Sequence, residues 1–358
     1  MWTMVDPTGR KASGVSVQVA TGRASSLPWG LITTDAELIE RIGSGLAEVE
    51  ALLEQAAHSD HPLIRETAGH LVAAGGKRFR PLLTLVAAEF GGAGVVGPSP
   101  EVLSAACVVE LTHMATLYHD DVMDEAPMRR GVQTANARWD NTIAILTGDF
   151  LFAKASQMLA DLGPEAVRLQ ASTFERLVTG QISECLEPGP QESAIEHYLR
   201  VLEDKTGSLI ATSARFGALL SGAPAPAVEQ LTRFGEVFGV AFQLADDVLD
   251  IAGDPEESGK VNGTDLREGV PTLPTLYALA STDAGSARLR ELLSAPINDD
   301  QLVAETLVAL REHEAMNQAR ATARRYADEA RALLEGLPDI PARAALHALC
   351  DLVHSRTV

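Results

Sequence analysis

The chain has 358 residues, of which 46% are hydrophobic, and its formal net charge at pH 7 is -20. This length suffices for one large domain or two ordinary ones, and the strong negative charge argues against nucleic acid as a partner. Aromatic residues make up only 4% of the chain, which favours packed helices over sheets. The three cysteines are scattered and no run of about 18 apolar residues occurs, so we expect a cytoplasmic protein without a transmembrane helix.

Helix-like periodicity follows the chain almost without interruption from about Asp35 onward. Residues 1–30 are interpreted as a flexible N-terminal tail and residues 31–358 as a single domain, because no strand-rich stretch or repeat interrupts the helical pattern. We therefore predict an all-α fold, one large helical bundle around a central cavity. The expected helices are Ala36–Ala57, His61–Ala73, Pro81–Phe90, Glu101–Val122, Ala135–Leu162, Pro164–Leu186, Ile195–Glu203, Leu209–Ser221, Ala227–Asp250, Thr272–Ala280, Ser286–Leu293, Gln301–His313, Ala315–Leu337 and Pro341–His354.

The first chemical motif along the chain is Gly75–Pro81, which reads Gly-Gly-Lys-Arg-Phe-Arg-Pro. Paired glycines let a backbone approach a ligand closely, and Pro81 is typical of a helix start, where free amides attract anions. Lys77 and Arg80 add an ammonium and a guanidinium, which suit a diphosphate. The alternative is an ordinary basic loop, but the acidity of the rest of the chain favours the anion site.

An acidic pentapeptide, Asp120–Asp124, follows the long apolar segment that begins near Glu101. On a helix Asp120 and Asp124 share a face and Asp121 lies beside them, so like charges repel at a helix end that already disfavours negative charge. Bound Mg²⁺ would remove this objection, because Mg²⁺ prefers a few carboxylates together with water and phosphate oxygens. The alternative is a solvated acidic helix end, which fits poorly with the apolar run before it.

A second pentapeptide of the same pattern, Asp246–Asp250, ends another long apolar segment. Two such clusters facing one another would form a cage for divalent cations that hold a diphosphate. Arg129 and Arg130 follow the first pentapeptide and would neutralise negative charge beside it. Weaker signals, each with a plain structural alternative as a core or surface residue, come from Lys205 and Thr206, Gln243 and His113.

At these residues the chain resembles the trans-prenyl diphosphate synthases, also called polyprenyl synthetases. The resemblance covers nearly everything from about Ala36 onward, and the combination of motifs is highly specific. It implies an all-helical bundle, usually a homodimer, whose aspartates line a central cavity. The matching motifs are Gly75–Pro81, Asp120–Asp124 with Arg129 and Arg130, Gly148–Phe150, Lys205–Thr206, Phe242–Asp250 and Gly263–Leu266.

The resemblance implies a 1'-4 condensation of isopentenyl diphosphate with an allylic diphosphate, by ionisation of the allylic C–O bond, alkene attack and proton loss. Its cofactor would be Mg²⁺, with three ions present when the allylic diphosphate is bound. A peripheral membrane contact would serve release of an oily product. The residues implied are Asp120, Asp124, Asp246 and Asp250 for the metal; Asp121, Asp247 and Lys205 as further catalytic residues; Arg129, Lys205, Thr206, Gln243 and Lys260 for the allylic diphosphate; and Gly76, Lys77, Arg80, His113 and Arg130 for isopentenyl diphosphate.

One position departs from the family pattern. Members commonly carry a lysine shortly before the Thr-Leu-Pro that follows the second aspartate motif, and here Val270 occupies that place. One cation on the diphosphate side is therefore missing, and Arg267 is a candidate substitute.

Small side chains upstream of Asp120 indicate a long product. In farnesyl synthases, bulky aromatics four or five residues before the first aspartate block the growing chain, whereas here those positions hold Thr116 and Ala115, and Thr112 lies one turn further. With about 1.5 Å of rise per residue along this helix, we expect an open tunnel and a product on the order of six to ten isoprene units. Met158 is a candidate floor. A resemblance to actinobacterial synthases that make menaquinone tails supports the longer product.

Other classes of protein share part of this motif pattern. Class I terpene cyclases also use an Asp-Asp-x-x-Asp cluster, but they need no second diphosphate site, and head-to-head synthases lack the Gly75–Pro81 segment. A non-catalytic subunit of a heteromeric synthase is expected to lose aspartates, and both clusters are intact here. A geranylgeranyl (C20) diphosphate synthase and the catalytic subunit of a heteromeric synthase are the alternatives that keep all the motifs.

Overall fold

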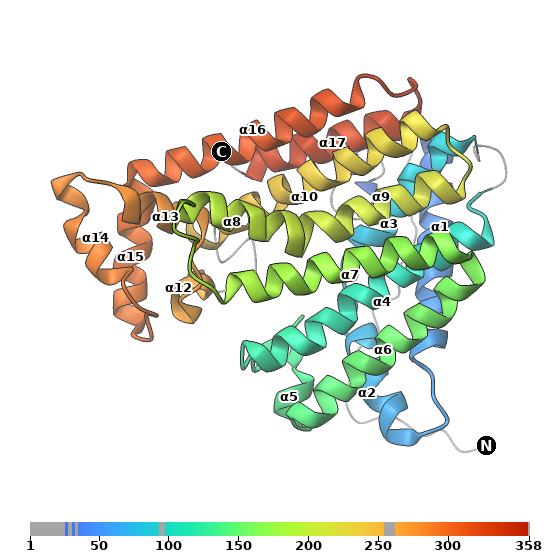
Figure 1. Ribbon diagram of the computed structural model, residues 1–358, viewed down its shortest axis with the longest axis horizontal. Coiled ribbons are helices and arrows are strands. Elements are labelled where there is room, and N and C mark those ends of the chain that lie inside the picture. Colours follow the sequence, from blue (N-terminus) through green and yellow to red (C-terminus); the bar gives the residue numbers. More distant parts are fainter. Residues whose placement is uncertain (1–25, 28–30, 33–34, 93–96, 254–261, 357–358) are drawn as a thin grey trace, which may run out of the picture.

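The computed structural model describes residues 26–27, 31–32, 35–92, 97–253 and 262–356, and most of them are helical, so the all-α prediction is confirmed (Figure 1). Two short antiparallel hairpins accompany the helices: β1 (Ser26–Leu27) with β2 (Leu31–Ile32), and β3 (Met128–Arg129) with β4 (Val132–Gln133). The helices are α1 (Ala36–Ala57), α2 (Pro62–Ala73), α3 (Phe79–Ala88), α4 (Pro100–Met123), α5 (Ala135–Arg138), α6 (Asn141–Leu162), α7 (Pro164–Glu184), α8 (Ala194–Leu202), α9 (Ser208–Leu220), α10 (Ala225–Ala252), α12 (Thr264–Glu268), α13 (Leu273–Ala280), α14 (Ala287–Leu292), α15 (Asp300–Glu312), α16 (Glu314–Leu334) and α17 (Pro341–Arg356).

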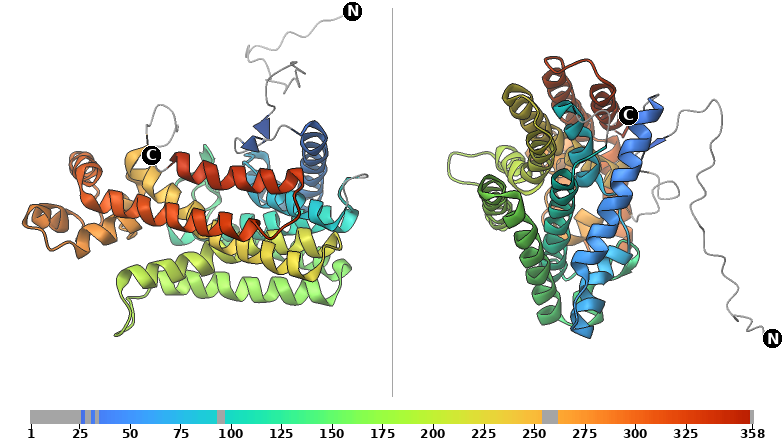
Figure 2. Two further views of the ribbon diagram at one scale, coloured as in Figure 1. Left: turned by 90° about the horizontal axis from the view of Figure 1, so that it is seen from above. Right: turned by 90° about the vertical axis from the view of Figure 1, so that its right-hand side faces the viewer.

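Two hydrophobic clusters hold these helices together. The larger cluster joins α1 to α7, α9, the first part of α10, the end of α16 and α17. The smaller one packs the second part of α10 against α8, α13, α14, α15 and the first part of α16. Figure 2 shows α14 and α15 set at one end of the longer helices. The helix α10 therefore belongs to both clusters and connects them.

Helix α4 lies at the centre of the larger cluster, because it is apolar on nearly every face. It begins at Pro100, where the Ser99 side chain accepts a hydrogen bond from the backbone N–H of Val102 at 3.3 Å. It packs against α3, α6 and α9 and ends at Asp124. The acidic pentapeptide is thus carried on a helix that the core holds firmly in position.

Helix α10 approaches its neighbours closely through two glycines. A Cβ atom added to Gly235 would lie 2.8 Å from the Ala211 Cα, and one added to Gly239 would lie 2.9 Å from the Gly207 Cα. Only glycine allows backbones to come this near. The contact brings the second acidic pentapeptide, farther along α10, into the same region as Lys205.

The structure corrects the prediction of one continuous helix over Ala135–Leu162. The chain leaves the helix at Trp139, and Asp140, in an extended conformation, caps the new helix α6 by accepting the backbone N–H of Ile143 at 2.8 Å. The proposed tail, residues 1–30, falls mostly outside the described residues. Of its described part, Ser26–Leu27 pair with Leu31–Ile32, and the boundary at residue 30 stays a prediction.

Among the described helices, α6 alone is long and apolar enough to cross a membrane by length and composition. Only 33% of its most apolar stretch is buried inside the molecule. It nevertheless packs on α2, α4 and α7 as one layer of the bundle.

Candidate active site

The first acidic cluster places Asp120 and Asp124 one turn apart at the end of α4, as the spacing predicted. The pKa of Asp120 is raised to about 6, mainly by burial and also by the charge of Asp124, while Lys205 acts in the opposite direction. Burial also raises the pKa of Asp124. The charged form of these carboxylates is therefore destabilised by burial, and a bound cation would offset that free energy.

Asp121, the second residue of the cluster, points into the protein. It is 0% exposed, and one of its oxygens accepts a hydrogen bond from the Arg129 Nε at 2.5 Å. Its other oxygen has no hydrogen-bond partner among the described residues. Asp121 thus fixes the β3–β4 hairpin that carries Arg129 and Arg130 beside the cluster.

The second cluster has a similar internal residue, Asp247. The Tyr198 hydroxyl donates to one of its oxygens, and the Gln243 Nε2 donates to the other at 3.1 Å. Burial raises the pKa of Asp247 to about 7, although both hydrogen bonds favour the charged form. Asp247 therefore orients Gln243, a residue that the sequence singled out, rather than facing a ligand itself.

The outer aspartates of the second cluster are held by other parts of the chain. Arg356, at the end of α17, donates to Asp246 at 2.9 Å, and its guanidinium lies over the Phe242 ring. Asp250 accepts the backbone N–H groups of Thr264 and Asp265 at the start of α12, at 3.3 and 3.4 Å. No local pattern marks Arg356, which is separated from Asp246 by 110 positions.

Lys205 and Thr206 lie in a π-helical turn, Glu203–Gly207, between α8 and α9. Such turns are frequent at functional sites. Lys205 donates to Glu184 at 2.5 Å, and its charge lowers the pKa of both Asp120 and Asp124. This cation is thus close to the first cluster, as expected.

The Gly75–Pro81 segment forms a strained, basic loop. The backbone φ angles of Gly75, Gly76 and Arg78 are all positive, at 77°, 152° and 47°. A Cβ atom on Gly76 would lie 3.0 Å from the Arg130 guanidinium, and Arg130 donates to the Gly75 carbonyl at 2.5 Å. The predicted loop and Arg130 are therefore in direct contact, and the second glycine is needed for that approach.

Arg80, Arg130 and His113 form the cationic part of this region. Burial lowers the pKa of Arg80 to about 10, and its Nε atom is buried without a hydrogen-bond partner among the described residues. Burial and then the charges of Arg80 and Arg130 lower the pKa of His113 well below its usual range, so the ring is neutral at pH 7. An unpartnered guanidinium N–H beside a second arginine suits an anionic ligand. Lys77 is exposed at the mouth of the loop.

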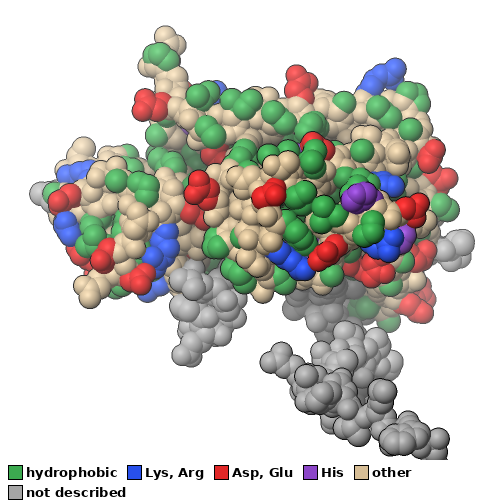
Figure 3. Space-filling model, turned by 90° about the horizontal axis from the view of Figure 1, so that it is seen from below, with side chains coloured by type: hydrophobic (Ala, Val, Ile, Leu, Met, Phe, Trp, Pro, Cys, Tyr) green, Lys and Arg blue, Asp and Glu red, His purple; other side chains and the backbone are tan. Residues whose placement is uncertain are grey.

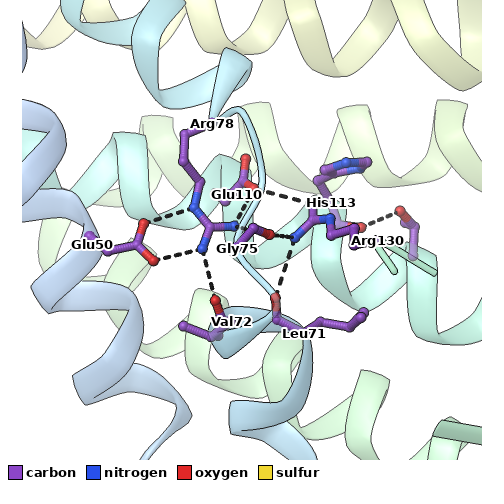
Figure 4. Close-up of polar contacts among 9 residues, drawn as sticks. Glu50, Leu71, Val72, Gly75, Arg78, Glu110, His113 and Arg130 are labelled. Carbon is purple, nitrogen blue, oxygen red and sulfur yellow. Dashed lines mark hydrogen bonds and ion pairs between the residues drawn. The ribbon is translucent and has the colours of Figure 1, made fainter. Parts of the chain in front are cut away.

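The buried Arg78 and its two glutamates were missed by the sequence argument (Figure 4). Arg78 donates to both oxygens of Glu50, at 2.8 and 2.7 Å, and to Glu110 at 3.1 Å. The same guanidinium also reaches the carbonyls of Val72 and Gly75. Arg78 thereby holds the loop in its left-handed conformation. Glu110, a charged residue within an apolar helix, was the available signal.

Around α12, Glu268 was also missed. Burial raises the pKa of Glu268, as do the charges of Asp124 and Asp250, which belong to different clusters. Both acidic clusters are therefore close enough to act on this carboxylate. Arg267, the candidate substitute for the missing lysine at Val270, instead pairs with Asp300 at 2.8 Å, so that suggestion is not supported. Lys260 lies outside the described residues.

The predicted wall of the product tunnel runs along α4 inside the core. Ala115 and Thr112 are fully buried, and the Thr116 hydroxyl donates to the His113 carbonyl at 2.8 Å. Thr112 also accepts a hydrogen bond from Gln170 on α7 at 2.7 Å. Met158, the candidate floor, is half-buried on α6 and packs against the core.

The donor groups fit a hard divalent cation such as Mg²⁺, since all are carboxylates, and burial raises the pKa values of Asp120 and Asp124. Within the part of the chain that the structure describes, no three His, Cys, Asp or Glu side chains converge closely enough to enclose a metal by themselves. Ions held here would complete their coordination with water or with oxygens of a bound ligand. This is the arrangement that Mg²⁺ adopts on phosphate substrates.

Taken together, the fold and site define a class: an all-helical protein with two acidic clusters for cations and a separate basic loop for an anion. Residues 61–310 match the model of the polyprenyl synthetase family. A nonaprenyl diphosphate synthase of Mycobacterium tuberculosis is 48% identical, over 91% of this chain and 97% of its own length. The chain belongs to the polyprenyl synthetase family.

Solved structures agree with this assignment. A geranylgeranyl pyrophosphate synthase of Corynebacterium glutamicum, complexed with calcium and isoprenyl diphosphate, superposes with a TM-score of 0.80 at 43% identity. That comparison covers 91% of this chain and 99% of the other. A decaprenyl diphosphate synthase of Rhodobacter capsulatus gives the same TM-score at 34% identity, over 90% and 98% of the two chains. The fold is therefore shared by synthases named for short and for long products.

Proposed function

We propose that this protein is a Mg²⁺-dependent prenyl diphosphate synthase, which condenses isopentenyl diphosphate 1'-4 with an allylic diphosphate. The observation that supports the proposal is that one fold carries two separate groups of residues, each of which suits an anionic ligand. One lies at the acidic clusters with Lys205 and Arg129, and the other at the loop with Arg80 and Arg130. A cyclase that ionises one diphosphate would need only the first region.

On this proposal Asp120, Asp124, Asp246 and Asp250 hold the ions, which supply Lewis-acid stabilisation of the leaving diphosphate. Lys205 and Arg129 add positive charge beside the first cluster. Gln243, held by Asp247, and Thr206 bind the same diphosphate, and we retain Lys260 there by resemblance.

The second substrate is held by Gly76, Lys77, Arg80, Arg130 and the neutral His113, which offers a hydrogen bond without adding charge. Placing the alkene of isopentenyl diphosphate against the allylic carbon supplies much of the rate acceleration. The apolar wall at Ala115 excludes water from the allylic carbocation. The proton leaves to the departing diphosphate, because a base among the buried apolar residues would be costly to keep charged.

We infer a long product, on the order of six to ten isoprene units, from the small residues along α4 and its rise of about 1.5 Å per residue. The 48% identity to a nonaprenyl diphosphate synthase supports this length and is consistent with a role in making menaquinone side chains. The 43% identity to a geranylgeranyl synthase supports a C20 product as the second candidate. Catalysis within a heteromeric enzyme is a further alternative, and 39% identity to a heptaprenyl diphosphate synthase component 2 favours it.

We also propose a cytoplasmic homodimer with a peripheral membrane contact for product release. Apolar side chains on α6 and α7 support the dimer, since they are 37% to 57% exposed on neighbouring helices. The face seen in Figure 3, on the side where α5 and α6 lie in Figure 1, also carries apolar side chains between charged ones. The α6 and α7 residues concerned are Ile145, Leu146, Phe174, Val178 and Ile182.

The test is incubation of the purified protein with Mg²⁺, farnesyl diphosphate and labelled isopentenyl diphosphate, followed by chromatography of the dephosphorylated products. We expect elongation that is abolished by chelation of the metal. No elongation by the isolated protein would refute a self-sufficient synthase, and a C20 ceiling would refute the long product. The variant Ala115→Phe is expected to shorten the products while keeping the first condensation, and unchanged products would place the tunnel elsewhere.

A further inference from the structure

Two polar side-chain pairs cross the apolar interior below the first acidic cluster. Gln170 on α7 donates to the Thr112 hydroxyl on α4 at 2.7 Å. One turn further along α7, the Thr173 hydroxyl lies 2.6 Å from that of Thr212 on α9. These four side chains are all nearly or fully buried. They link α4, α7 and α9 at a level where the rest of the core is hydrophobic.

Gln170 is the unusual member of this group. The inward face of α7 is formed by Ala166, Gln170, Thr173 and Leu177, so an apolar residue is expected at position 170. Gln170 is 7% exposed, and its Oε1 atom has no hydrogen-bond partner within the described residues. Whichever way the amide is turned, Thr112 satisfies only one of its two polar groups. A side chain kept only for packing would not leave half of a buried amide unbonded.

The position of the pair relates it to the growing product. Thr112 is eight residues before Asp120 on one continuous helix, which places it about 12 Å along the axis. Thr112, Ala115 and Thr116 follow the same face of α4 at spacings of three and four residues. A chain that starts at the acidic cluster and extends along this face therefore reaches the Gln170 amide after passing two small side chains.

We propose that Gln170, bonded to Thr112, is a residue that limits product length. This inference rests on the proposed function, since it concerns a prenyl chain that starts at Asp120. To grow past the pair, the prenyl chain must separate the Gln170 amide from the Thr112 hydroxyl. The hydroxyl keeps its hydrogen bond to the Val108 carbonyl at 2.9 Å, but the prenyl chain offers the amide no new partner. Burying the unbonded amide against hydrocarbon is unfavourable. The pair therefore places two polar groups in the path of the growing prenyl chain, and elongation slows when the chain reaches them.

The experiment compares wild type with Gln170→Met, which keeps the side-chain length but removes the amide, and Gln170→Ala, which removes both. Thr112→Val removes the hydroxyl that accepts the hydrogen bond from Gln170. Gln157→Ala, at an exposed position on α6, is the matched control. Each protein is given Mg²⁺, farnesyl diphosphate and labelled isopentenyl diphosphate, and product lengths are read by chromatography after dephosphorylation.

We expect the most abundant product of Gln170→Met, Gln170→Ala and Thr112→Val to lengthen by at least one isoprene unit, and that of Gln157→Ala to stay unchanged. Unchanged lengths in the folded Gln170→Met and Thr112→Val proteins would overturn the proposal, as would lengthening confined to Gln170→Ala, since that would indicate volume rather than the polar pair. Circular dichroism confirms folding. Failure of wild type to elongate at all would instead refute the proposed function, so the two failures are distinct.

Discussion

At the end of α4, Asp120 and Asp124 have no ion-pair partner within the described residues, whereas all three aspartates of the α10 cluster are held by distant segments. Arg356 pairs with Asp246, Tyr198 and Gln243 bond Asp247, and the start of α12 bonds Asp250. In both clusters the second aspartate is buried, as Asp121 and Asp247. The same five-residue pattern thus yields one cluster that depends on added cations and one that is already stabilised by the protein.

The largest expected difference between the clusters follows from Asp120→Asn. We expect kcat/KM to fall by about 10²- to 10³-fold, because a group that stabilises transition-state charge is lost. The metal-free protein should keep or gain stability, since a buried carboxylate with a raised pKa is replaced by a neutral amide. Activity assays and thermal unfolding without metal measure both effects. A decrease in kcat/KM of less than tenfold would contradict the assignment of Asp120 as a metal ligand.

Tyr198→Phe tests the internal support of the second cluster. It leaves buried Asp247 without one hydrogen bond, and we expect the free energy of unfolding to fall by about 1–3 kcal/mol. Tyr277→Phe is the matched control, since the Tyr277 hydroxyl bonds Thr322 at 3.0 Å in a half-buried position. Urea unfolding of both variants gives the comparison. Equal decreases in the free energy of unfolding of the two variants would contradict a specific stabilisation of Asp247 by Tyr198.

The pH dependence of stability provides a third test. The folded-state pKa values of Asp247, about 7, and Asp120, about 6, lie above the ordinary value of 3.8, so the folded protein binds more protons than the unfolded chain between these limits. The free energy of unfolding of the metal-free protein should therefore contain a contribution that decreases as the pH rises from about 4 to 7. Asp247→Asn should flatten this decrease. A steeper decrease in the variant would contradict the assignment.

Arg356→Ala is expected to have the smallest effect. The pair with Asp246 is partly exposed, so its loss should change the free energy of unfolding by less than about 1 kcal/mol. Because one cation that competes for the Asp246 carboxylate is then removed, the Mg²⁺ concentration for half-maximal activity should fall, by less than about tenfold. Titration of activity with Mg²⁺ measures this shift. A higher Mg²⁺ requirement would show that Arg356 supports metal binding.

The sequence predicted the helices and the main chemical groups because both leave local signals. Apolar periodicity identified the helical bundle, and charge crowding in Asp120–Asp124 and Asp246–Asp250 identified the acidic clusters. The basic loop at Gly75–Pro81 was recognised in the same way. The structure brings this loop into contact with Arg130, while the binding roles proposed for these residues stay predictions.

Residues that act through distant contacts escaped the sequence argument. Arg356 and Tyr198 meet the second cluster only after the chain has folded, and nothing in their neighbourhoods marks them. Arg78 stood within the basic motif, yet its role depends on Glu50 and Glu110, which lie on two other helices. The inward direction of Asp121 and Asp247 also depends on which helices pack against α4 and α10, and periodicity alone does not fix that.

Helix α4 carries Glu110, Ala115 and Asp120 on one uninterrupted rod. Since Glu110 and Asp120 are ten residues apart, the basic loop and the metal cluster are separated by a fixed rise of about 15 Å and a fixed rotation. Inserting or deleting a single residue between them would turn one site by about 100° relative to the other. On the proposed function, substitutions along α4 can therefore change product length without altering the spacing of the two regions, whereas an insertion or deletion would alter that spacing.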